Sequence, residues 1–411
     1  MENRKETRDA DFTVLMIGQR RTGKSSVLSA MLRSMEKLCD ETGFQFIADE
    51  DTQSQMKTKL LYLENIFYVH ERDEVFSTLE GYKNNVDYGM MTDEALFYRF
   101  HLGLVDKKKS KNDYIVEFVD IRGEDMLCDI EEEGHTIKDW IEKCSIIMIA
   151  IDSPALMEGK WKKGYGEHHD KVNVPESIYD CITSADKKMR AKLKDNQRLP
   201  PKLILFVPLK CEKYYYQNEM GRLNEVLKKG YGNLFSFLEE RTEYSVAITP
   251  ILTLGDVVFD HYKTKKLPSG KEVVELFGDE ALESMRYTPK APLFSLRKIE
   301  RPKFSPQYCE QPLLYLLAYV MSVTGHIQEL EKKKKQRGIL PMVIKIAKHT
   351  FFYFLFGVFY IAFLGIRAVM NDKPFLKQAG KVISRVKLTG DGYELVQDNL
   401  GLKKIIEEYQ S

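Results

Sequence analysis

The sequence contains few cysteines and no pattern that pairs them. The six cysteines of this 411-residue chain include no C-x-x-C pair, and several lie inside apolar runs. This absence favours reduced, buried thiols in a cytosolic compartment. Residues 1–11 are polar and charged and contain no apolar stretch, so we expect no secretory signal peptide. A metal-ligand set is also lacking: residues 167–170 hold two histidines and two acids, but no further partner is suitably spaced, which predicts a polar loop.

The chain also lacks internal repeats, and its one low-complexity stretch is the lysine run at 332–335. Its 43% hydrophobic and 30% charged residues exclude a wholly disordered or collagen-like chain. The net charge of +1 conceals an asymmetry. Residues 332–411 carry 15 Lys/Arg and 6 Asp/Glu, or +9, which leaves −8 for residues 1–331. We therefore do not expect the first part to bind nucleic acid.

Apolar runs and helical patterns follow one another along the first 330 residues. The runs at 144–152 and 202–209 are near-continuous, which is typical of strands buried on both faces of a parallel sheet. Further strands are predicted at 11–17, 95–104, 114–120 and 244–254, and helices at 24–39, 175–195 and 218–241. This order predicts a doubly wound α/β sheet, with residues 43–93 as an insertion before the second strand.

A complete phosphate-loop motif follows the first predicted strand. It reads Gly18-Gln-Arg-Arg-Thr-Gly23-Lys24-Ser25 and fits G-x-x-x-x-G-K-[ST], with a helical pattern after it. Glycines let the backbone wrap around phosphate oxygens, and the N–H groups of the loop and of the helix N-terminus point at the anion. Lys24 is expected to reach the β- and γ-phosphates, and the Ser25 hydroxyl to ligate Mg²⁺. The predicted nucleotide-binding residues here are Gly18, Gln19, Arg20, Arg21, Thr22, Gly23, Lys24, Ser25 and Ser26.

A second motif ends the third predicted strand. Residues 115–124 read I-V-E-F-V-D-I-R-G-E, a strand that finishes in D-x-x-G. We expect Asp120 to hold Mg²⁺ through water and the Gly123 N–H to contact the γ-phosphate.

At these two motifs the chain resembles the translation-factor-like and Ras-like branch of P-loop GTPases. In that family the residue after D-x-x-G is usually a glutamine that positions water, and here it is Glu124. The resemblance implies that Glu124 orients or deprotonates the attacking water. Arg20 and Arg21 occupy loop positions where small GTPases keep small residues. Each is either a charge near the γ-phosphate or a solvated surface residue.

The resemblance also implies a switch threonine just before the second strand of the G domain. Thr92 is the best match and is predicted as a catalytic residue and a Mg²⁺ ligand, with Thr52 and Thr78 as competitors.

The base-recognition motif departs from the family pattern N-K-x-D. Residues 203–209 run into Lys210-Cys-Glu212, and Leu209 stands where the family has asparagine. By analogy, the Lys210 stem packs over a purine and Glu212 accepts hydrogen bonds from guanine N1 and N2. We therefore expect GTP to be preferred to ATP.

Over residues 11–330 the pattern resembles the bacterial double-GTPase group found in effector and defence-type systems. The shared features are the G-x-R-x-x-G-K loop, the long insert, D-x-x-G-E, P-L-K-x-E, and the segment at 247–256. The resemblance implies a Mg²⁺-dependent GTPase that acts as a molecular switch with protein partners. A nucleotide-sensing scaffold with weak turnover and an ATPase remain alternatives.

The C-terminal region contains the most apolar stretch of the chain. Residues 350–366 carry no charge and are just long enough for a membrane-spanning helix, with lysines and arginines on both sides. Membrane insertion, an interfacial or re-entrant helix and a buried core helix are all open. We therefore predict a G domain at 1–331 and a basic region at 332–411 whose last 40 or so residues form a small appendage. We also predict a G domain that faces the cytoplasm and is anchored to the inner membrane.

Overall fold

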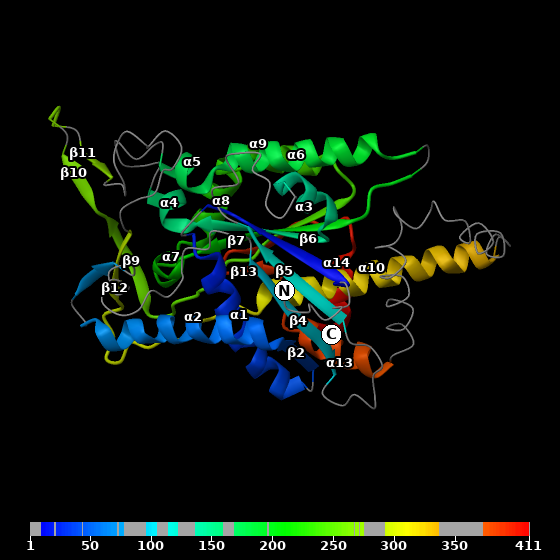
Figure 1. Ribbon diagram of the computed structural model, residues 1–411, viewed down its shortest axis with the longest axis horizontal. Helices are drawn as coiled ribbons and strands as arrows, with labels where there is room; N and C mark the ends of the chain where they lie inside the picture. Colours follow the sequence, from blue (N-terminus) through cyan, green and yellow to red (C-terminus); the bar gives the residue numbers. More distant parts are fainter. Residues whose placement is uncertain are drawn as a thin grey trace, which may run out of the picture.

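A nine-stranded sheet forms the centre of the molecule (Figure 1). The computed structural model describes residues 10–19, 22–42, 44–71, 74–77, 96–104, 114–121, 136–158, 168–194, 197–266, 268–270, 272–274, 292–336 and 373–410. The strand order is β13-β14-β8-β7-β6-β1-β5-β4-β2. The strands are β1 (Phe12–Ile17), β2 (Phe44–Ala48), β4 (Leu96–Leu104), β5 (Tyr114–Asp120), β6 (Ile146–Asp152), β7 (Lys202–Leu209), β8 (Tyr244–Ile248), β13 (Thr389–Gly390) and β14 (Tyr393–Gln397).

Strands β8, β7, β6, β1 and β5 run parallel, and β4 and β2 extend the sheet antiparallel at one edge. Every residue of β6 and β7 is buried, as the two near-continuous apolar runs predict. Because side chains alternate along a strand, each strand supplies both faces. Val14 and Met16 of β1 belong to one core, whereas Leu15 and Ile17 belong to the other. The mixed α/β fold with a large, mostly parallel sheet is consistent with a P-loop-type domain.

Helices cover both faces of the sheet (Figure 1). One face packs against α3 (Ile137–Lys143), α6 (Pro175–Ala191), α8 (Met220–Gly230) and α9 (Gly232–Glu239). The other packs against α1 (Lys24–Thr42), α10 (Gln311–Gln336), α13 (Lys373–Ile383) and α14 (Leu402–Gln410). Shorter helices follow β6 and β7, namely α4 (Ser153–Glu158), α5 (His168–Asn173) and α7 (Glu212–Tyr216). The histidine pair expected in a polar loop therefore begins a helix, and His169 is buried.

The predicted insertion contributes to two different sheets. Its first strand, β2, pairs with β4 in the central sheet. Strand β3 (Val75–Ser77) forms instead a small accessory sheet with β12 (Pro292–Leu296) and β9 (Val257–Tyr262). Helix α2 (Glu50–Val69) packs along α1, and its last turns join the accessory body that this sheet forms. Leu63, Ile66 and Phe76 pack there against Leu254 and Phe259. A separate hairpin pairs β10 (Thr264–Lys266) with β11 (Glu272–Val274).

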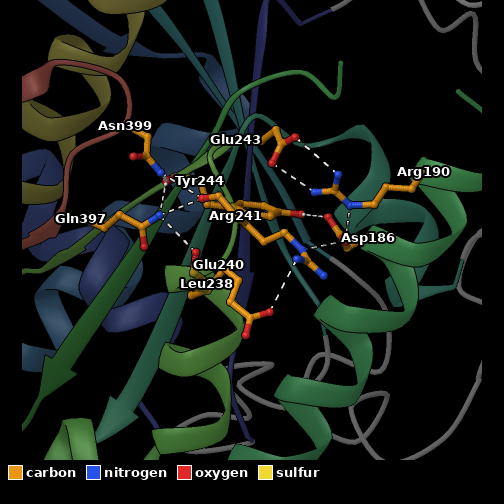
Figure 2. Close-up of polar contacts among 9 residues, drawn as sticks. All are labelled: Asp186, Arg190, Leu238, Glu240, Arg241, Glu243, Tyr244, Gln397 and Asn399. Carbon is orange, nitrogen blue, oxygen red and sulfur yellow. Dashed lines mark hydrogen bonds and ion pairs between the residues drawn. The ribbon is translucent and has the colours of Figure 1, made fainter. Parts of the chain in front are cut away.

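The end of the chain is built into the central sheet. Strand β14 pairs antiparallel with β8, and Ala379, Ile383 and Ile406 lie fully buried in the core beneath α10. The side-chain amides of Gln397 and Asn399 donate to backbone carbonyls at 2.8–3.2 Å (Figure 2). The acceptors are the carbonyls of Leu238, Arg241 and Tyr244. The end of β14 and the residues after it thus satisfy backbone carbonyls between the last turn of α9 and the start of β8. Residues 373–410 thus add two strands to the sheet and two helices to its core, and do not form a separate appendage.

The apolar stretch at 350–366 lies outside the described residues. Among the helices that the structure describes, none combines the length and apolarity needed to cross a bilayer.

We expect the end of the chain to stabilise the whole sheet. Ile406→Ala removes a fully buried side chain from the core and should lower the free energy of unfolding by about 2–5 kcal/mol. Lys404→Ala, an exposed position on the same helix, should change it by less than about 0.5 kcal/mol. Urea unfolding of the full chain, followed by fluorescence, measures both. A wild-type unfolding curve for Ile406→Ala would show that α14 is an independent appendage.

Candidate functional site

The phosphate loop joins β1 to α1 and lies against the ends of β6 and β7. Gly18 and Gly23 have φ angles of 149° and 110°, which favour glycine. A Cβ on Gly18 would lie 2.8 Å from the carbonyl oxygen of Ala150 in β6. A Cβ on Gly23 would lie 3.7 Å from Cδ1 of Leu209 in β7. The two glycines are therefore needed for their backbone conformation, and at Gly18 also for the close approach of a neighbouring strand.

Lys24 is buried at the first position of α1. Its Nζ donates to the Gly18 carbonyl at 2.7 Å and lies 3.4 Å from the Gln19 carbonyl. The buried Thr22 also donates its hydroxyl to Gln19 O, at 2.9 Å. The Gly18 and Gln19 carbonyls thus hold the ammonium near the N-terminus of α1, which is the positive end of the helix dipole. Ser26 follows in the first turn of α1.

Asp120 brings the second motif to the same place. Because β5 runs parallel to β1, its carboxyl end lies beside the phosphate loop. Ser25 Oγ donates to Asp120 Oδ2 at 2.8 Å, and Lys24 Nζ lies 3.8 Å from Asp120 Oδ1. A hydroxyl and a carboxylate oxygen side by side are the hard oxygen donors that Mg²⁺ prefers, so these two residues fit the predicted metal. Within the described residues, no group of three or more His, Cys, Asp or Glu side chains could hold a metal by itself.

Two residues near this site carry no motif. Lys59 of α2 donates to the hydroxyl of buried Tyr98 in β4 at 2.8 Å. Burial lowers the pKa of Lys59, and the charge of Asp120 opposes that shift. The pKa of Tyr98 is raised by burial and by Asp120, and a hydrogen bond with Ser25 acts in the opposite direction. The insertion therefore supplies a second ammonium next to Ser25 and Asp120. From the sequence alone, Lys59 is a single lysine in a predicted helix and cannot be distinguished from a lysine exposed to solvent.

Lys210 follows β7 and has a left-handed backbone with φ 55°. Its Nζ lies 2.5 Å from Asp152 Oδ2 at the end of β6. Asp152 was not predicted as a site residue from the sequence. Its signal is an acidic residue at the end of the apolar run at 144–152, where a strand of a parallel sheet was predicted.

Glu212 is buried, and its carboxylate does not project freely into a base pocket. Its Oε1 accepts from the Leu254 backbone N–H at 2.8 Å, in the loop after β8. Burial raises the pKa of Glu212 to about 7, against the lowering effect of backbone hydrogen bonds, with Leu254 the foremost of these. The residue predicted to read guanine thus joins the segment after β7 to the loop after β8.

Five of the predicted site residues lie outside the described residues, as does the competitor Thr78. They are Arg20, Arg21, Thr92, Gly123 and Glu124. The other competitor, Thr52, is described. Its N–H donates to Asp49 Oδ1 at 2.8 Å, and its Oγ1 accepts from Arg99 N at 2.9 Å. Thr52 therefore joins the start of α2 to β4.

Comparison with known proteins finds only distant structural similarity. No protein-family model matches the chain, and no curated protein matches it. Similar solved structures include the S. cerevisiae Ski7 GTPase-like domain, bound to GTP in one structure and to GDP and inorganic phosphate in another. They share 12% and 14% identity with the chain, with TM-scores of 0.29 and 0.28. Each match covers 59% of this chain and 43% of the other, so this chain spans less than half of those structures' length. Similarity this low carries no functional argument.

Glu212 predicts a pH-dependent stability. Its pKa of about 7 lies above the ordinary value of 4.5, so folding favours its protonated form. This contribution is complete below about pH 4.5 and is lost as the pH rises to 7, for a total near 3 kcal/mol. Glu212→Gln keeps an acceptor for Leu254 N–H but does not titrate. Between pH 5 and 8 the wild type should therefore lose about 2–3 kcal/mol more unfolding free energy than the variant.

Urea unfolding at the two pH values measures this difference. Glu225→Gln, at an exposed position on α8, controls for the loss of one negative charge. Parallel pH profiles for the wild type and Glu212→Gln would contradict the prediction.

Proposed function

We propose that this protein binds a guanine nucleotide with Mg²⁺ and hydrolyses GTP slowly, as a molecular switch. One observation carries the proposal: Lys24, Ser25 and Asp120 meet at the carboxyl ends of the neighbouring strands β1 and β5. This arrangement combines a buried ammonium, two hard oxygen donors and a helix N-terminus. These are the elements that a triphosphate with its cation needs.

Each of these residues has a distinct task. Lys24 supplies the main counter-charge to the β- and γ-phosphates once its ammonium turns from the Gly18 carbonyl towards them. Ser25 and Asp120 would hold the cation, Asp120 through water. Bound Mg²⁺ would neutralise part of the negative charge of the triphosphate. On the motif resemblance, Thr92 completes the ligand set, Gly123 N–H contacts the γ-phosphate, and Glu124 orients the attacking water. Arg20 and Arg21 lie within the phosphate-loop motif, so either could add positive charge near the γ-phosphate.

The base side supports a guanine preference through two residues. Lys210 offers its aliphatic stem to the purine, and Glu212 offers carboxylate oxygens to guanine N1 and N2. Since Glu212 bonds to Leu254 in the described structure, guanine must compete for that carboxylate. Glu124, which stands where the resembled family usually has a water-positioning glutamine, keeps a nucleotide-sensing scaffold with negligible turnover as the second candidate. Membership of the bacterial double-GTPases, and a role in an effector or defence system, stay predictions from the motifs.

The full chain should bind GTP more tightly than ATP and turn it over slowly with Mg²⁺. Lys24→Ala should weaken GTP binding roughly 30-fold or more, because a buried triphosphate loses its counter-charge. Lys37→Ala, an exposed position on the same helix, should have no effect on GTP binding.

Glu124→Ala should lower kcat for GTP hydrolysis and leave the affinity for GTP nearly unchanged. Competition against a fluorescent GTP analogue and steady-state phosphate release measure these quantities.

Each alternative has its own outcome in this experiment. Tight GTP binding without measurable turnover would support the scaffold, and equal affinity for ATP would remove the guanine preference. Native affinity in Lys24→Ala would falsify the phosphate site.

We also propose that residues 350–366 associate with the inner membrane without carrying the chain across it. Helix α10 precedes this stretch and α13 follows it, and both pack into one core. A single crossing would separate β14 from β8 by the bilayer, which their pairing excludes. Seventeen apolar residues suffice for at most one crossing, so an interfacial or re-entrant placement fits best. The G domain and the end of the chain then both face the cytoplasm.

The full chain should float with vesicles that contain anionic lipid. Phe354→Asp combined with Phe359→Asp should abolish flotation, because each large apolar side chain gains roughly 1.5–3 kcal/mol on leaving water. Tyr68→Asp, which changes an exposed aromatic residue on α2, serves as the control. Tags at both ends of the chain should be cleaved from the same side of the vesicle. A full chain that remains monomeric and unbound without detergent would overturn the membrane proposal.

A further inference from the structure

A buried ion pair joins the ends of β6 and β7 beside the phosphate loop. Asp152 is the last residue of β6 and pairs in register with Leu209, the last residue of β7. Lys210 comes next, and its Nζ lies 2.5 Å from Asp152 Oδ2. The exposed fractions of the two side chains are 5% and 14%. An ammonium this poorly solvated depends strongly on a nearby counter-charge, because little water remains to replace it.

The surroundings fix Asp152 at its backbone and at its carboxylate. Its N–H donates to Asn173 Oδ1 at 2.8 Å, and its carbonyl accepts from Asn173 Nδ2 at 3.1 Å. Its Oδ1 accepts from Ala155 N at 2.9 Å and from the Tyr262 hydroxyl at 3.3 Å. With Oδ1 held from two directions, Oδ2 is presented to Lys210 in one orientation.

Lys210 itself has a strained backbone. A φ of 55° is unusual for a residue other than glycine and persists where the surroundings enforce it. Preceding it, Leu209 is buried and its Cδ1 lies against Gly23 of the phosphate loop. An aliphatic side chain has no donor or acceptor with which to hold the lysine. In the described structure that task falls to Asp152, on the neighbouring strand.

We propose that Asp152 is the positioning residue for base recognition: by holding the Lys210 ammonium, it presents the lysine stem to the purine of the bound nucleotide. The proposal rests on the proposed function, because it assigns a base to the loop after β7. In this chain the lysine is then oriented from β6, and Leu209 supplies apolar contact with the phosphate loop.

Two probes separate the base from the phosphates. GTP uses both the phosphate loop and the base loop, whereas inorganic tripolyphosphate uses the phosphate loop alone. Asp152→Asn keeps the shape of the side chain and removes its charge. It should weaken GTP binding about tenfold or more and leave tripolyphosphate affinity unchanged. Lys210→Met, which keeps an aliphatic stem, should behave in the same way. The double variant should bind GTP as tightly as the single variant with the lower affinity, because both substitutions remove the same interaction.

Tyr262→Phe provides a milder test that is less disruptive to folding. It removes one hydrogen bond to Asp152 and should weaken GTP binding by about two- to tenfold, again without changing tripolyphosphate affinity. The measurement is competition against a fluorescent GTP analogue, with the unfolding midpoint of each variant as a folding check.

The outcomes are distinct. Equal losses for GTP and tripolyphosphate, additive losses in the double variant, or unchanged GTP binding in Asp152→Asn and Tyr262→Phe would each overturn the positioning role. If the wild type binds neither probe in a Lys24-dependent way, the proposed function itself fails.

Discussion

The parallel pairing of β1 with β5 on one side and β6 on the other determines where the candidate site residues lie. Parallel strands bring their carboxyl ends to one edge of a sheet, which is where open α/β folds place their ligands. The phosphate loop and the loop after β7 follow strands of this group, and Asp120 and Asp152 are the last residues of β5 and β6. A shift of register between β1 and β5 would separate Ser25 from Asp120, and the hydroxyl–carboxylate pair would be lost.

The parts of the fold with a local cause could be predicted from the sequence. Continuous apolar runs predicted the buried strands, and the glycine spacing predicted the loop between β1 and α1. What depended on the register of one strand against another, or on the fold of a particular loop, could not be predicted. The role of Asp152 needs the register of β6 against β7, and the bond from Glu212 to Leu254 needs the fold of the loop after β8. The pairing of β14 with β8 was missed because a short, half-polar strand carries little signal alone.

The additions to the central sheet converge on the two ends of the candidate site. From α2, in the insertion, Lys59 reaches Tyr98 near Ser25 and Asp120. From β9, far along the chain, Tyr262 reaches Asp152 at the base end. Helix α2 and strand β9 pack into one small core. A single accessory body thus contacts both Tyr98 and Asp152, and a change of packing in it would alter both ends of the candidate site.

The strand that closes the sheet beside β8 comes late in the chain, and this has a consequence for biosynthesis. Tyr393 and its hydrogen-bond partner Pro250 are 143 positions apart. At a typical translation rate, about 10–30 s pass between the synthesis of these two residues. During that interval the backbone groups along one edge of β8 await their partner, and an unpaired strand edge is a template for association with other chains. The nascent protein is therefore prone to aggregation until β14 has been synthesised, and chaperones that bind nascent chains could protect it during this interval.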